Sequence, residues 1–163
     1  MKLMKRIEFF QLVQPLTEKL YSMAFALVPD DLQAEQLVID SMNAFLLKEK
    51  KLVLNKLVDL ESKKNAQLLR RTYYKSILRY MCEIGVRRSH QMGETSLVQP
   101  AENFRAFFAL DPKVRFVMKL RFEGQFTAQE IEEIVQLPKY EVIEKLHNGR
   151  FLLLNDLNRG VHL

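Results

Sequence analysis

The sequence predicts an all-α protein made of two small helical domains joined by a flexible linker. Apolar residues recur at helical spacing along the chain, with no stretch of strand-like alternation. Proline, glycine and aspartate divide these periodic stretches into helices. The segment 88–101 is polar, has no period and contains Gly93 and Pro100, which is typical of a linker. We therefore expect domains at 1–87 and 102–163, with 88–101 between them.

Three helices are expected in the first domain. The first covers residues 5–28 and is bent or restarted at Pro15. Pro29, Asp30 and Asp31 then form a turn and a cap, and a second helix runs over 32–48. The charged segment 48–64 is a connector, and the third helix covers 65–84. One face of the second helix is apolar or small and should be buried: Ala34, Leu37, Val38, Ser41, Met42, Phe45 and Leu46.

The second domain begins with a short helix at 102–110 and continues with three helices separated by two tight breaks. Asp111-Pro112 is a helix start, and Gly124 supplies a stop. Thr127 and Glu130 have the spacing of a capping box at the start of the second of these helices. The segment 136–138 ends that helix, and another runs from about Lys139 to 154. Two short helices across such a turn favour a helix-turn-helix; three ordinary helices of an all-helical core are the alternative.

Composition narrows the classes of protein to consider. The 163 residues are 48% hydrophobic and 28% charged, which is a globular composition. The single cysteine, Cys82, permits no internal disulfide and has apolar neighbours, so we expect a buried structural thiol in a cytoplasmic protein. No apolar run is long enough to span a bilayer, and the N-terminus lacks a small-residue cleavage site, so we do not expect export.

Positive charge is concentrated in one part of the chain. Residues 63–90 hold eight lysines and arginines against one acid, Glu83, whereas residues 101–163 hold nine basic and nine acidic residues. In the helix 65–84, Arg71, Lys75 and Arg79 are four residues apart and form one basic stripe. Such a stripe is a candidate nucleic-acid footprint. It is equally explained by a solvated helix face, or by a face that meets an acidic protein.

Two blocks of the sequence resemble bacterial sigma factors of the extracytoplasmic-function type. In the C-terminal block, EGQFTAQEIEEIVQLPKYEVIEKLHNGR, the family pattern is matched by Gly124, Thr127, Glu130-Ile131, Leu137-Pro138, Val142, Leu146 and Arg150. In the N-terminal block, LYSMAFALVPDDLQAEQLVIDSMNAFLL, it is matched by Leu20-Tyr21, Ala24, Asp30, Ala34-Glu35, Leu37-Val38 and Asp40. Together the blocks and the helix between them make up nearly half of the 163 residues.

The resemblance implies a transcription initiation factor that binds core RNA polymerase and directs it to promoter DNA, with an anti-sigma factor as a further partner. The helix 32–48 would dock on a coiled coil of the largest polymerase subunit, with Glu35 and Asp40 as exposed acids. In the helix 65–84, basic residues would bind phosphates of melted DNA, and Tyr74 is the best candidate for stacking on a base. The DNA-binding residues expected from this helix and from the C-terminal block are Arg70, Arg71, Tyr74, Lys75, Arg79, Thr127, Lys139, Tyr140, Lys145 and Arg150.

Several positions depart from the family pattern. Gln36 and Ile39 replace the usual docking residues, and Glu141, Ile143, Glu144 and Asn148 replace polar or basic residues of the recognition helix. Because carboxylates repel phosphates, these departures favour a second interpretation. In that interpretation the chain is a degenerate, sigma-like interaction module that binds polymerase or an anti-sigma factor without reading promoters.

We expect no enzyme activity, cofactor, metal, small-molecule substrate or membrane partner. The three histidines, His90, His147 and His162, lack metal-ligand spacing with any cysteine or carboxylate. The five glycines are scattered and form no phosphate-binding loop.

Overall fold

The computed structural model describes residues 2–49, 63–92 and 104–160, and within these ranges the chain is helical and contains no strand. The first half consists of α1 (Lys2–Val13), a 3-10 turn η1 (Gln14–Leu16), α2 (Thr17–Leu27), α3 (Asp31–Lys48) and α5 (Lys63–Met92). The second half consists of α6 (Arg105–Phe108), α7 (Pro112–Phe122), α8 (Ala128–Val135) and α9 (Lys139–Gly160). The prediction of an all-α protein is confirmed.

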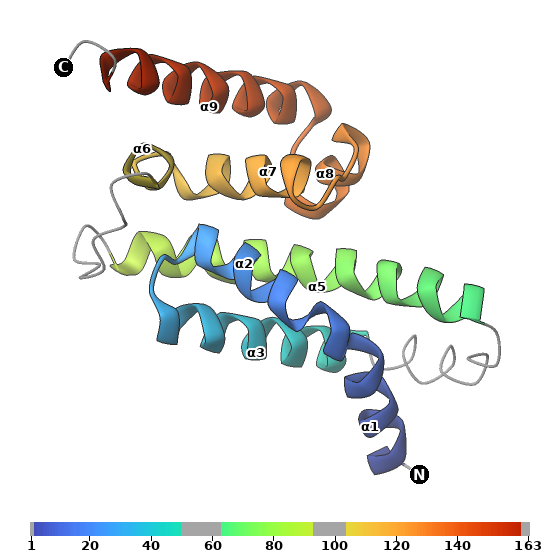
Figure 1. The fold of residues 1–163 in the computed structure, drawn as a ribbon. Helices are drawn as coiled ribbons and strands as arrows, with labels where there is room; N and C mark the ends of the chain where they lie inside the picture. Colours follow the sequence, from blue (N-terminus) through green and yellow to red (C-terminus); the bar gives the residue numbers. More distant parts are fainter. Residues whose placement is uncertain (1, 50–62, 93–103, 161–163) are drawn as a thin grey trace.

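The helices are stacked in layers (Figure 1). α3 packs against α2 and α5, α7 and α8 lie on the other side of α2 and α5, and α9 covers α7 and α8. One continuous cluster of buried side chains includes residues of both halves, from Phe9 and Leu37 to Phe126 and Val142. The two halves therefore share one core in this arrangement. The predicted division into two domains stays a prediction, and residues 93–101 of the predicted linker lie outside the described residues.

Local capping signals place most helix ends where the sequence predicted them. Asp30 accepts a hydrogen bond from the Gln33 amide at 2.9 Å and starts α3, and Asp111 accepts one from the Lys113 amide at 3.0 Å and starts α7. The predicted bend at Pro15 is η1, with Pro15 in its first turn. The first long helix is thereby divided into α1 and α2. The buried face of α3 includes Ala34, Leu37, Val38, Ser41 and Phe45, as expected.

Several predicted helix boundaries are wrong. The last helix, predicted from about Lys139 to 154, extends to Gly160. The helix predicted at 65–84 extends to Met92, so residues 88–92 of the predicted linker are helical. Gly85 lies inside this helix and allows α2 and α3 to pack closely: a Cβ there would lie 2.7 Å from Leu27 Cδ1 and 2.9 Å from Leu37 Cδ2. The helix predicted at 102–110 is shorter, since α6 spans Arg105–Phe108; residues 102–103 and 50–62 lie outside the described part.

Gly124 is also needed for close packing, because the left-handed backbone that ends α7 is not at Gly124 itself. The residue with a left-handed backbone after α7 is Gln125, with φ of 54°. A Cβ on Gly124 would lie 2.7 Å from the ring of Phe126, which is fully buried. The chain therefore turns sharply at 124–126, and the Phe126 ring is buried in the core. Gln136, with φ of 55°, makes the matching left-handed turn between α8 and α9.

Arg115 joins the two halves of the molecule. It lies on α7, is 5% exposed, and extends its guanidinium to the C-terminal end of α2. Its Nε donates to the Ala26 carbonyl at 2.6 Å and Nη2 donates to the Leu27 carbonyl at 3.3 Å. Its Nη1 donates to the carbonyls of Phe108 and Leu110, at 3.0 and 2.5 Å.

The buried cation suits this place because the last carbonyls of a helix lack intrahelical donors and carry the negative end of the helix dipole. Burial lowers the pKa of Arg115 to about 10, against a smaller opposing effect of Asp111, so the side chain stays protonated at neutral pH.

We expect Arg115→Met to destabilise the protein by about 2–4 kcal/mol, because four carbonyls, three of them in buried hydrogen bonds, would lose a charged donor. Arg115→Lys keeps the charge but not the planar fork, so its loss should be smaller. Urea unfolding followed by circular dichroism measures both changes. Equal stability of the Met variant and the wild-type protein would contradict this role for Arg115.

Candidate nucleic-acid interface

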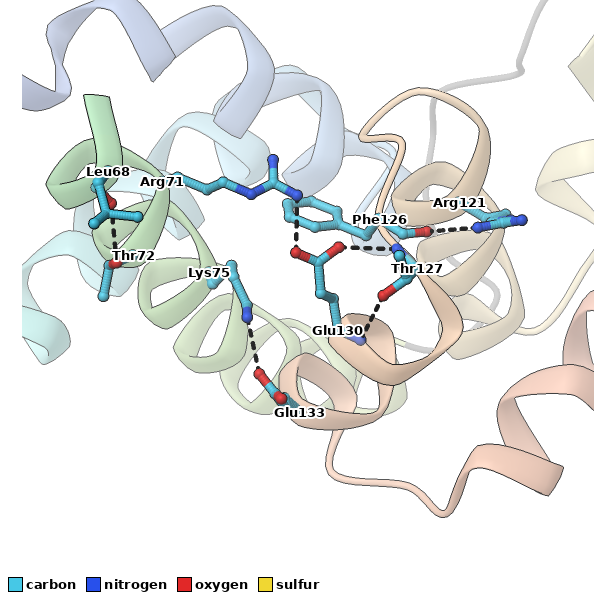
Figure 2. Close-up of polar contacts among 9 residues, drawn as sticks. All are labelled: Leu68, Arg71, Thr72, Lys75, Arg121, Phe126, Thr127, Glu130 and Glu133. Atoms are coloured by element: carbon cyan, nitrogen blue, oxygen red, sulfur yellow. Dashed lines mark hydrogen bonds and ion pairs between the residues drawn. The ribbon is translucent and has the colours of Figure 1, made fainter. Parts of the chain in front are cut away.

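The basic stripe predicted on α5 is present, but each of its three cations has an acidic neighbour. Arg71 Nη2 lies 2.9 Å from Glu130 Oε1, and Lys75 Nζ lies 2.8 Å from Glu133 Oε2 (Figure 2). Both acids belong to α8, so α8 covers the N-terminal part of the stripe. Arg79 Nη2 lies 3.7 Å from Glu49 Oε1, just after the end of α3.

Glu130 connects the stripe to the start of α8. Its Oε2 accepts a hydrogen bond from the Thr127 amide at 2.9 Å, and the Thr127 hydroxyl accepts one from the Glu130 amide at 3.2 Å. This is the predicted capping box, and it is confirmed. Thr127, expected to contact DNA, therefore serves here as the N-cap. The same carboxylate binds Arg71, so one side chain supports the helix end and the contact between halves.

Tyr74 lies in the core and not at the border of the polar face, where the sequence placed it. It is 6% exposed, and its ring centroid lies 5.6 Å from that of Phe126. Arg71 stacks on the other ring of this pair, with Cζ 5.0 Å from the centroid of Phe126. Burial raises the pKa of Tyr74 to about 12, and its hydroxyl has no hydrogen-bond partner within the described ranges.

Arg70 and Arg79 are held by neighbouring groups of the first half. Arg70 Nε donates to the Leu12 carbonyl at 2.9 Å, which ties α5 to α1. Arg79 Nη2 donates to the Tyr80 hydroxyl at 3.3 Å, and that hydroxyl donates to Glu49. Both arginines retain partial exposure. All four predicted cations of α5, these two together with Arg71 and Lys75, thus combine a structural bond with access to solvent.

On α9 the predicted DNA contacts lie on different sides of the helix. Tyr140 is 68% exposed, and Lys139 and Arg150 are exposed, whereas Lys145 is partly buried. Arg150 stacks over Phe122 of α7, with Cζ 4.9 Å from the ring centroid. The outward side of α9 also carries apolar residues: Ile143, Phe151 and Leu154 are 40%, 64% and 60% exposed. The structure does not gather the predicted cations of α9 with those of α5.

The two acids predicted for polymerase docking lie on α3 but differ in their surroundings. Glu35 is exposed. Asp40 is partly buried, forms an ion pair with Arg88 of α5 and accepts a hydrogen bond from Gln36 at 3.0 Å. Burial alone would raise the pKa of Asp40, but the hydrogen bonds from Arg88 and Gln36 outweigh it and hold the pKa below its usual value. Asp40 therefore links α3 to α5, while Glu35 faces solvent.

Sequence reasoning missed Glu130 and Glu133 as members of this interface. The signal was present, because Arg71 and Lys75 are one helical turn apart on α5 and the two acids are one turn apart on α8. An apolar groove was also missed; it has a volume of about 860 Å³, lies between α2, α6, α7 and α9, and is lined by residues such as Phe25, Phe107, Phe122 and Leu153.

Other kinds of site receive no support from the described residues. Within them, no group of three or more His, Cys, Asp or Glu side chains is placed to hold a metal ion. Cys82 is buried, and burial raises the pKa of its thiol to about 11, as the prediction of a structural thiol implied. None of the helices found in the described ranges has the length and hydropathy needed to cross a membrane.

The sequence matches no family model, and no curated protein matches it.

We expect the contribution of Glu130 to the stability of the folded protein to depend on pH. Burial acts to raise its pKa, but the Thr127 amide and Arg71 outweigh burial and lower the pKa below its usual 4.5. The stabilisation from this ionised carboxylate is therefore present above pH 4.5 and is lost as the pH falls through the lowered pKa.

Glu130→Gln should lower the free energy of unfolding by less than about 1 kcal/mol at neutral pH. The ion pair is partly exposed, and Gln can still accept a hydrogen bond from the Thr127 amide. Glu130→Ala should cost about 1–2 kcal/mol, because the cap is lost as well. Urea midpoints at neutral and acidic pH test both, and the Gln variant should show a weaker pH dependence than the wild type. An unchanged pH dependence would contradict the assigned role of Glu130.

Proposed function

We propose that this chain is a sigma-like transcription initiation factor that binds core RNA polymerase and directs it to promoter DNA. The observation that carries the proposal is the outer face of α3. Leu32, Ile39 and Leu47 are 73%, 50% and 73% exposed, and Glu35 lies beside them. No other described helix covers these side chains.

The spacing on α3 suits docking on a helical surface. Leu32 and Ile39 are seven residues apart and Leu47 follows eight residues later, so they fall along one side of the helix. Exposed apolar residues at this spacing are typical of a helix that packs against a partner helix. The α3 block also resembles the sigma segment that docks on a coiled coil of the largest polymerase subunit. Ile39, which departs from the family pattern, supplies apolar contact area on this face.

The DNA-binding part of the proposal is supported by the helix order α7, α8, α9 and by the basic stripe. A short turn at 136–138 separates α8 from α9, and the buried residues Ile134 and Val142 join the two helices in the core. This is the helix order of a helix-turn-helix, with α9 as the recognition helix. Lys139, Tyr140 and Arg150 remain exposed on it.

One observation favours a second candidate, an interaction module that binds polymerase or an anti-sigma factor without reading promoters. Arg71 and Lys75 are already bound by acids of α8, and Tyr74 is covered by Phe126. α9 in addition carries Glu141 and Glu144. Reconstitution with core polymerase separates the two candidates, because only the first predicts promoter-specific transcripts.

For polymerase docking, we expect Leu32→Lys with Glu35→Lys to weaken co-purification with core enzyme by roughly tenfold or more, because the pair removes apolar area and reverses a charge at the centre of the face. Asp40 is left unchanged, since it holds Arg88 and its replacement would disturb the fold.

A matched control is Glu18→Lys with Leu68→Lys, which makes the same chemical changes at exposed positions of α2 and α5. The control should bind normally. Full binding by the α3 variant would remove the basis for assigning this face to polymerase.

For DNA binding, we expect the complex of this chain, core polymerase and forked DNA to weaken steeply with salt. Lys75→Ala and Arg79→Ala should each flatten the slope of log affinity against log salt by about 0.7, the value for one phosphate contact on a single strand. Titrations at several salt concentrations measure the slope. A slope that neither substitution changes would favour the interaction module.

A further inference from the structure

We infer that the segment from Phe126 to Glu133 is an intramolecular competitor of DNA, which occupies the basic stripe of α5 as a mimic of a nucleotide chain. The inference rests on the proposed function and concerns the regulation of the same site. In it, the carboxylates of Glu130 and Glu133 take the places of two phosphates, and the ring of Phe126 takes the place of a base.

Two acids of α8 pair with two cations of the basic stripe. Arg71 and Lys75 are one turn apart on α5, Glu130 and Glu133 are one turn apart on α8, and the contacts are 2.9 and 2.8 Å long (Figure 2). A carboxylate presents anionic oxygens to a guanidinium or ammonium group as a phosphate does. A phosphate that binds this part of the stripe competes with these two carboxylates for the same cations.

The contacts of the Phe126 ring resemble those of a nucleotide base. The Phe126 ring lies against Tyr74, the tyrosine expected to stack on a base, at a centroid distance of 5.6 Å and an interplanar angle of 37°. Arg71 lies over the Phe126 ring at 5.0 Å while it binds Glu130, four residues further on. One arginine thus contacts a ring and an anion of the same segment, as an arginine on single-stranded DNA contacts a base and a phosphate.

The ion pairs and the apolar contacts contribute differently to the stability of the packing of α8 on α5. The ion pairs are partly exposed, with side-chain exposures of 49% and 22% for one pair and 26% and 56% for the other, so each is weak. The arrangement in which α8 lies on α5, called closed below, is stabilised mainly by buried apolar side chains such as Phe126 and Ile131. Neutral substitution of the acids therefore lowers the competition with DNA and leaves the fold intact, and Gln at 130 preserves the capping box.

The test compares Glu130→Gln with Glu133→Gln, as a double variant, against the wild type and a charge-matched control. The control is Glu18→Gln with Glu132→Gln, which removes two charges from α2 and α8; neither side chain has an ion pair among the described residues. The probe is fluorescein-labelled oligodeoxythymidine, titrated in the absence and presence of core polymerase. Loss of two partly exposed ion pairs predicts binding tighter by between about 2-fold and about 30-fold for the double variant. The control should stay near the wild type.

A second readout reports opening directly. The chain contains no tryptophan, so Phe126→Trp places a single fluorophore against Tyr74. Its emission should move to longer wavelength when the oligonucleotide binds, and less oligonucleotide should be needed when the two acids are Gln. Should the Trp not be accommodated at 126, Tyr74→Trp reports on the same contact from α5.

The outcomes are distinct. Equal affinity of the double variant and the control, or DNA binding with no change in emission, overturns the inference and leaves the proposed function standing. Absence of DNA binding by every variant, even with core polymerase, contradicts the DNA-binding function and the inference with it. Tighter binding by the double variant together with the emission shift supports both.

Discussion

The position of Arg115 determines how the second half of the chain lies on the first. Its guanidinium satisfies the last carbonyls of α2 and those before α7, and no carboxylate is needed because the helix end itself supplies negative potential. With α7 fixed against α2, the sharp turn at 124–126 brings α8 over α5. The contacts of Phe126, Glu130 and Glu133 with the basic stripe all follow from that placement.

Features set by neighbours in sequence were predictable, whereas those set by distant parts of the chain were not. The caps at Asp30, Asp111 and Thr127 depend on residues two or three positions away, so their spacing was sufficient. The roles of Gly85 and Gly124 depend on side chains that pack against their backbones, and a sequence shows only that glycine is present.

The candidate interface shows the same limit. Helical periodicity separates one apolar side of α5 from one basic side, and this correctly located the stripe of Arg71, Lys75 and Arg79. It cannot show that α5 is covered from a second direction, so Tyr74 was placed near solvent although it is buried. The uneven charge of the two halves did contain the missing information. Residues 63–90 are strongly basic, whereas α8 carries three acids and no base. Two of these acids pair with the basic stripe, so an acidic partner of the stripe lies within the same chain.

The hydroxyl of Tyr74 gives the closed arrangement a built-in cost. It is buried without a hydrogen-bond partner among the described groups, and leaving such a group unpaired disfavours burial by about 1–3 kcal/mol. A phenylalanine would fill the same space without that penalty and would suit a permanently closed interface better. In the opening that we infer above, the Tyr74 hydroxyl would be hydrated and this penalty removed. The hydroxyl of Tyr73 is also buried without a partner among the described groups, so the first half carries a similar penalty of its own.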